Sequence, residues 1–166
     1  MDVNEPAEIV HELESTVWVR KVNHARSTGD LCRWVSSFHP HRLACHLIGG
    51  FLHGAYNLGQ KVKFSDGTAW LVRFPRVGNV CNKYADEKVA MEVEVLHLVR
   101  DNTTIPVPGV KAWGSATHNP LGLGPFIIMD FIEGVSLDAL LKDPTTPNTR
   151  LLRSDVRDSN IEFIYK

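Results

Sequence analysis

The feature of this sequence that most restricts its fold is a tight turn between two stretches of alternating apolar and polar residues. The turn is Ser65-Asp66-Gly67-Thr68, and Asp-Gly at its centre is a strong signal for a β-hairpin. The stretches on either side, residues 58–64 and 69–75, are predicted to be its strands. A short apolar run at 45–50 precedes them, so short connections predict an antiparallel meander of three strands.

The later part of the chain adds a helix and two more strands. Asp86 is expected to cap a helix that runs to about Arg100. Pro106 and Pro108 stop helical continuation and favour an extended stretch that leads into a strand at 110–113. The almost wholly apolar segment 126–131 is typical of a strand buried on both faces. The predicted fold class is therefore α+β, with a five-stranded antiparallel sheet and one packed helix.

The two ends of the chain differ from this central part. Residues 1–40 are predicted to be a helical extension with one amphipathic helix from about Glu5 to Val22, whose apolar positions are Ile9, Leu13 and Val17. Trp34 and Phe38 are expected to pack onto the main body. Residues 41–142 form the predicted central domain, and 143–166 a linker followed by an incomplete helix. That helix begins at the capping box Ser159-Asn160-Ile161-Glu162.

Composition excludes several classes of function. The chain has 166 residues with 18 basic and 19 acidic side chains, a net charge of −1, and no Lys/Arg-rich run that would favour nucleic acid or an anionic membrane. The apolar runs are too short for a transmembrane span, and the acidic N-terminus does not resemble a secretory signal. Cys32, Cys45 and Cys81 lack metal or redox spacing, which favours reduced thiols in a cytoplasmic protein. His39 and His41 have no acidic or cysteine ligand nearby, so no metal site is predicted there.

A glycine-rich segment lies between the first two predicted strands. It reads Gly49-Gly50-Phe51-Leu52-His53-Gly54, and glycines allow backbone N–H groups to approach a phosphate without a Cβ in the way. The segment is neither a P-loop nor a clean G-x-G-x-x-G pattern. An ordinary hairpin turn is therefore the alternative interpretation.

Two charged residues stand at apolar positions of the predicted elements. Arg73 lies within an apolar strand, where a charge is costly unless it is paired, faces a site, or extends its head into solvent from an edge strand. On the predicted helix, Glu92 falls on the apolar side, whereas Glu94 falls in the polar arc. That apolar side consists of Val89, Val93, Leu96 and Val99. Glu92 is either a border residue or the ion-pair partner of Arg73, which we expect to lie within ion-pair distance.

Five segments in this order resemble the aminoglycoside phosphotransferase and choline kinase branch of the protein-kinase-like phosphotransferases, and in particular its fungal members. The resemblance spans about residues 32–166, and its segments lie at 49–57, 66–75, 86–93, 104–108 and 124–134. It implies the small, N-terminal lobe of that fold. It also implies that ATP is the cofactor, bound through residues Gly50, Gly54, Arg73, Glu92, Met129, Asp130 and Ile132.

Each of these residues takes a role from the resemblance. The 50–57 turn would cover the ATP phosphates, Arg73 would contact them, and Glu92 would hold Arg73. Met129 would stand beside the adenine. The backbone C=O of Asp130 and the backbone N–H of Ile132 would make the hydrogen bonds to the adenine edge.

The family's catalytic loop is missing from this sequence. No His-x-Asp is followed by a suitable Asn, so the sequence offers neither the proton acceptor nor the Mg²⁺ ligands of such enzymes. We therefore expect no catalytic or metal residues here, weak ATP binding, and Mg²⁺ only in a full-length homologue. Three hypotheses follow: an inactive, truncated phosphotransferase; a noncatalytic module that binds a nucleotide or a protein; and a truncated gene product without its own function. An exposed C-terminal apolar surface, expected from the leucines at 137–141 and the apolar residues at 161–165, would favour a protein partner or self-association.

Overall fold

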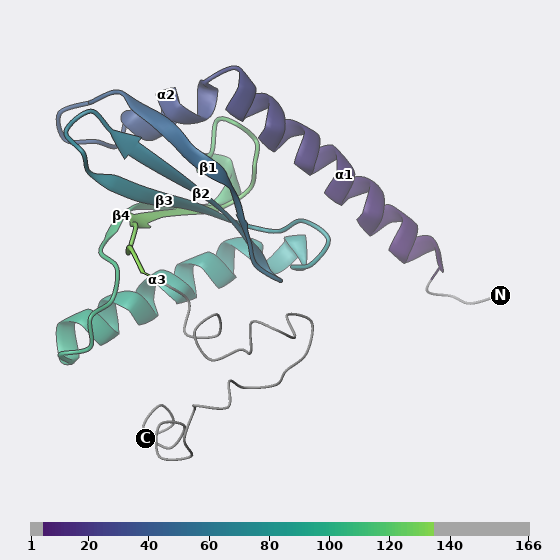
Figure 1. Cartoon of the computed structure of the whole chain (residues 1–166). Coiled ribbons are helices and arrows are strands. Elements are labelled where there is room, and N and C mark those ends of the chain that lie inside the picture. The colour runs from purple at the N-terminus through teal and green to yellow at the C-terminus, as the bar shows by residue number, and fades with distance from the viewer. Residues whose placement is uncertain (1–4, 135–166) are drawn as a thin grey trace, which may run out of the picture. The chain divides into compact units, whose positions relative to one another are not determined.

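The computed structural model describes residues 5–134, with side chains from residue 9 onward, and it confirms an α+β fold (Figure 1). Its elements are α1 (Glu5–Ser27), α2 (Asp30–Ser36), β1 (Cys45–His53), β2 (Asn57–Phe64), β3 (Ala69–Pro75), η1 (Asn82–Tyr84), α3 (Ala85–Asn102), β4 (Val110–Gly114), η2 (Ala116–His118) and β5 (Phe126–Asp130). The chain divides into two compact units, 1–131 and 132–166. The structure describes only residues 132–134 of the second unit. The predicted C-terminal helix and apolar surface lie outside the described residues.

The five strands form one antiparallel sheet, as predicted, and their order in the sheet is β1-β2-β3-β5-β4. The hairpin between β2 and β3 has the predicted turn. Gly67 adopts a φ of 91°, a left-handed conformation that glycine takes without a steric penalty. The Asp66 carboxylate accepts a hydrogen bond of 2.9 Å from the Thr68 N–H, which fixes the turn.

The glycine-rich segment departs from the prediction, because it continues β1 as far as His53 and does not end the strand at Gly50. Gly49, with a φ of 64°, and Gly50 form a β-bulge at which the register with β2 shifts between Ile48 and Phe51. Phe51 then resumes the pairing opposite Gln60. The glycines therefore produce an irregularity within a strand, and the turn itself occupies residues 54–56.

The helix α1 was predicted, but it is longer than expected and buries different residues. Ile9, Leu13 and Val17 are exposed, Leu13 by 63%. The buried residues of α1 are Trp18, Val22 and Ala25, and the Trp18 Nε1–H donates a hydrogen bond of 2.8 Å to the Leu123 carbonyl. The second half of α1 therefore docks the helix onto the body.

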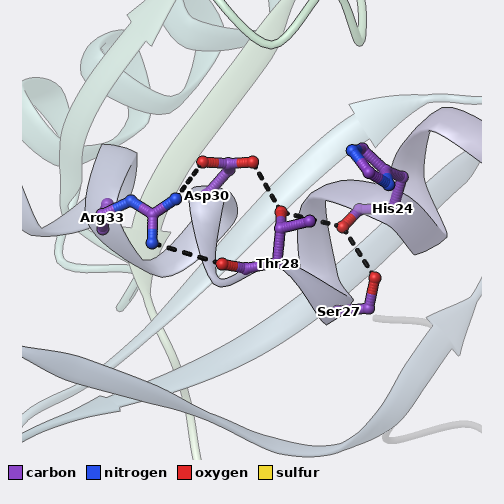
Figure 2. Close-up of polar contacts among 5 residues, drawn as sticks. All are labelled: His24, Ser27, Thr28, Asp30 and Arg33. Atoms are coloured by element: carbon purple, nitrogen blue, oxygen red, sulfur yellow. Dashed lines mark hydrogen bonds and ion pairs between the residues drawn. The ribbon is translucent and has the colours of Figure 1, made fainter.

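A polar corner joins α1 to α2 (Figure 2). The chain reverses at Gly29, whose φ is 76°, and the Arg33 guanidinium pairs with Asp30 while donating a hydrogen bond of 3.2 Å to the Thr28 carbonyl. The Thr28 hydroxyl lies 2.5 Å from the Asp30 carboxylate, and these contacts lower the pKa of Asp30. The corner fixes the direction in which α2 leaves α1.

The face of the sheet that packs against α1 and α2 has an aromatic core, and we call it the aromatic face. The Trp34 ring packs edge-to-face on Phe126 at a centroid distance of 4.6 Å and stacks near Phe74 at 6.3 Å. Phe38 contacts the same Trp34 ring at 5.4 Å. The predicted packing of Trp34 and Phe38 onto the main body is confirmed, so residues of the predicted extension contribute to the main core.

The opposite face of the sheet packs against α3, and we call it the α3 face. Its core is a smaller aliphatic cluster of Val89, Val93, Ile127 and Met129. The predicted cap of α3 is wrong: Tyr84 occupies the N-cap position without a side-chain hydrogen bond, and Asp86 lies in the first turn. The Asp86 carboxylate instead accepts a hydrogen bond of 2.8 Å from the Ala116 N–H, so it ties α3 to the segment after β4. Within residues 5–134, no helix has the length and apolar character needed to cross a membrane.

Candidate functional site

The candidate site lies on the α3 face, where Arg73 of β3 forms an ion pair with Glu92 of α3. The alternation of β3 turns Arg73 away from the aromatic face, and Glu92 is on the side of α3 that contains Val89 and Val93. The two side chains are only 22% and 29% exposed. The predicted ion pair is confirmed, and desolvation by this partial burial lowers the pKa of Arg73 from its ordinary value.

A second cation, Lys88, stands one helical turn before Glu92. Its Nζ donates a hydrogen bond of 3.3 Å to the Asn57 side-chain carbonyl at the start of β2. Partial desolvation lowers the pKa of Lys88, and the positive charge of Arg73 lowers it further. The group therefore holds two cations and one carboxylate in a partly buried setting, which leaves one positive charge in excess.

The turn between β1 and β2 is anchored beside this group. The carbonyls of Gly54 and Tyr56 accept hydrogen bonds of 3.2 and 2.9 Å from the side chain and backbone of Arg76, and the Ala55 carbonyl accepts one of 2.8 Å from Asn79. The Gly54 N–H closes the turn by donating 2.9 Å to the Asn57 carbonyl. Asn57 therefore links the turn, through its backbone, to Lys88, through its side chain.

The structure brings some of the predicted cofactor residues together and separates others. Arg73 and Glu92 are in contact, and Gly54 lies in the neighbouring turn. Gly50 lies instead in the β1 bulge, outside that turn.

The residues predicted to contact adenine lie in and after β5. Met129 is opposite Leu71, which lies two residues before Arg73 on the same face, and Met129 is only 4% exposed because it packs in the aliphatic cluster of α3. The Asp130 side chain is engaged by Lys111 at 2.8 Å and by the Gly109 N–H at 3.1 Å. Ile132 follows β5 in the second unit and is exposed. The adenine contacts of these residues stay a prediction.

The donor set suits an anion better than a metal ion. A planar guanidinium and an ammonium, both partly desolvated, bind phosphate oxygens through charge-assisted hydrogen bonds. Among residues 5–134, no group of three or more His, Cys, Asp or Glu side chains is placed to hold a metal ion. His39 is buried, and its ring packs against the Phe64 ring at a centroid distance of 4.5 Å.

Comparisons of the chain with models of known protein families, with curated proteins and with solved structures found no match.

Sequence reasoning missed the residues that support the site. Lys88 and Asn57 are 31 positions apart, and neither stands at an unusual position of its own element. Arg76 and Asn79 follow a predicted strand in a segment without a recognisable pattern. One usable signal was present for Lys88, because it precedes the inward-leaning Glu92 by four residues and therefore lies on the same side of the helix.

Proposed function

We propose that this chain contains the nucleotide-binding lobe of an ATP-dependent small-molecule phosphotransferase of the protein-kinase-like type. The observation that carries the proposal is the Arg73–Glu92 ion pair, which stands with Lys88 next to the anchored turn between β1 and β2. The order of the strands and of α3 agrees with the small lobe that the sequence resembles. In this proposal the site binds the phosphates of ATP.

Each group has a separate task in this proposal. Glu92 holds the guanidinium of Arg73, so less side-chain freedom is lost when a phosphate binds. Lys88 supplies the excess positive charge, because the carboxylate of Glu92 compensates for only one of the two cations. The turn at 54–56 keeps its backbone shape through bonds to Arg76 and Asn79, which allows N–H groups to meet a phosphate without prior rearrangement.

The experiment that tests this proposal is a titration of the purified 166-residue chain with ATP, with and without Mg²⁺, by calorimetry. We expect weak binding that Arg73→Met reduces by about tenfold or more, since a hydrogen bond to a charged group contributes roughly 1.5–3 kcal/mol. Arg100→Met is the matched control, because Arg100 also forms an ion pair, with Asp101 at 3.4 Å, but this pair is exposed and lies near the end of α3. Equal affinities for the two variants, or tight Mg²⁺-dependent binding, would contradict the proposal.

The same chain is expected to show no ATP turnover with a panel of small-molecule acceptors. The sequence lacks the His-x-Asp and Asn arrangement that positions the attacking hydroxyl and the metal, and catalysis of phosphoryl transfer consists almost entirely of positioning and electrostatic stabilisation. Turnover that survives rigorous removal of contaminating host kinases would contradict this expectation.

A second candidate function, a noncatalytic protein-binding module, is favoured by α1. Ile9, Val10 and Leu13 are each more than half exposed, and Leu13 borders a cavity of about 550 Å³ between α1 and the segments around Pro75 and Leu123. Such exposed apolar side chains are typical of an interface when they lie together. A chain that binds no ATP, and whose concentration-dependent association is abolished by Leu13→Ser, would support this function over the first.

A further inference from the structure

Two cysteines from different elements lie side by side where α2 meets the start of β1. Cys32 belongs to α2, and Cys45 is the first residue of β1. The Cys45 Sγ lies 3.4 Å from the Cys32 carbonyl and 3.5 Å from the Ser36 Oγ, and the two thiol groups hydrogen-bond to each other. Both cysteines are free and partly buried, whereas Cys81 is free and exposed.

A cavity of about 380 Å³ adjoins both cysteines. Its lining consists of Cys32, Arg33, Ser36, Ser37, Arg42, Ala44 and Cys45. Two arginines and two serines therefore line this cavity together with the two cysteines. Arg42 adopts a left-handed backbone conformation with a φ of 49°, and its N–H donates 2.8 Å to the His39 carbonyl. The cavity has room for a small polar molecule next to the two cysteines.

The surroundings of the two thiols shift their pKa values in opposite directions. The hydrogen bond from the Cys32 thiol lowers the pKa of Cys45 to about 7, assisted by the Ser36 hydroxyl and opposed by partial burial. The same contact and partial burial raise the pKa of Cys32. The other charged groups of the cavity lining are Arg33 and Arg42. Cys45 is thus the more acidic thiol of the two and the better nucleophile of the pair near neutral pH.

We propose that Cys32 and Cys45 form an oxidation-sensitive dithiol site whose substrate is a small peroxide. The Cys45 thiolate attacks one oxygen of hydrogen peroxide, the O–O bond breaks, and the products are Cys45 sulfenic acid and hydroxide. The Cys32 sulfur then attacks the Cys45 sulfur, a disulfide forms, and the sulfenic oxygen leaves as water with the Cys32 proton. Overall, two thiols and one peroxide give one disulfide and two waters, and the new bond ties α2 to β1.

The sequence gives no hint of this site, because 13 positions separate the cysteines and that spacing matches no redox motif. The fold creates it by returning the chain from α2 to the edge of the sheet.

The test is peptide mapping of the reduced 166-residue chain after treatment with hydrogen peroxide near pH 7. Alkylation of the remaining thiols and digestion with trypsin place the three cysteines in the separate peptides 27–33, 43–61 and 77–83. We expect peptides 27–33 and 43–61 to appear joined, with a loss of two hydrogens, while 77–83 remains alkylated at Cys81. Oxidation of Cys81 before the other two, or only intermolecular disulfides, would overturn the proposal.

Three serine variants separate the roles of the thiols. Cys81→Ser is the matched control and should give the same joined peptides. Cys32→Ser should leave on Cys45 a sulfenic acid that dimedone traps faster than any on Cys81, because no resolving thiol remains beside Cys45 and the Ser36 hydroxyl still favours its thiolate. Cys45→Ser should leave Cys32 unreactive. Equal trapping of Cys45 and Cys81 in folded Cys32→Ser, checked by circular dichroism, would count against the assigned roles, and the wild-type map decides the case if a variant does not fold.

Discussion

The two faces of the sheet are packed with different kinds of residue. The aromatic face buries the rings of Trp34, Phe74 and Phe126 against one another and against α1 and α2. The α3 face has a small aliphatic cluster, and beside it stand the ion pair of Arg73 and Glu92 and the ammonium of Lys88. A single strand serves both faces, because β3 alternates between them. The difference indicates that the aromatic face supplies most of the stability, whereas the α3 face holds charged residues that the fold does not need for its stability.

The largest expected effect is a difference in free energy of unfolding between one truncation on each face. Phe126→Ala on the aromatic face should cost about 3–5 kcal/mol, the usual range for a buried aromatic ring. Val93→Ala on the α3 face should cost about 2 kcal/mol, from roughly 0.8 kcal/mol per buried methylene plus a small cavity. Urea unfolding followed by circular dichroism measures both. Equal costs at these two fully buried sites would remove the proposed difference between the faces.

A smaller effect is expected from the ion pair. Arg73→Leu or Glu92→Leu alone should cost about 1–3 kcal/mol, less than for a fully buried pair, because each leaves one partly exposed charge without its partner. The double variant Arg73→Leu/Glu92→Leu should return to within about 1 kcal/mol of the wild type, since no charge is then left unpaired.

That double variant also separates the contribution of the ion pair to stability from its contribution to ATP binding. It should be folded and yet bind ATP no better than Arg73→Met does. Arg100→Leu serves as the exposed control and should change stability by no more than about 0.5 kcal/mol. A double variant as unstable as the sum of the two single variants would mean that the pair is itself a main source of stability on the α3 face.

The smallest effect concerns the pH dependence contributed by Lys88. The folded chain lowers the pKa of Lys88 below its ordinary value of 10.5, mainly by desolvation. Between the folded and unfolded pKa values the folded state binds fewer protons, so the wild type gains stability as pH rises through that window. The free energy of unfolding of the wild type minus that of Lys88→Met should therefore increase as the pH rises toward the ordinary pKa of 10.5 from below. A flat or falling difference would show that Lys88 is not desolvated.

Local periodicity was sufficient to predict much of this molecule. The hairpin at 65–68, the strand β3 and the inward lean of Glu92 all follow from patterns of two or 3.6 residues within one element. The Arg73–Glu92 pair could be predicted because each partner stood at a costly position and adjacent elements offered only a few places to meet.

Other features could not be predicted, because they depend on contacts between distant segments. The helical periodicity of α1 pointed to Ile9, Leu13 and Val17 as its apolar face, but the helix buries Trp18, Val22 and Ala25 instead. The glycines before residue 54 suit a turn and a bulge equally well, since glycine accommodates the positive φ that either can contain, as Gly49 does here. The Lys88–Asn57 contact and the pair Cys32–Cys45 arise only after the sheet has formed.

The bulge at Gly49 also determines how this sheet can meet another one. β1 is an outer strand of the sheet, β4 is the other, and β4 likewise has a shift of register, between Val110 and Ala112. An uninterrupted edge strand presents a continuous row of unpaired N–H and C=O groups. A strand of another molecule can form hydrogen bonds to this row and start a fibril. Each outer strand here is interrupted within its length, so an incoming strand finds only a few consecutive backbone groups in register. The two irregularities therefore disfavour β-aggregation at both edges of the sheet.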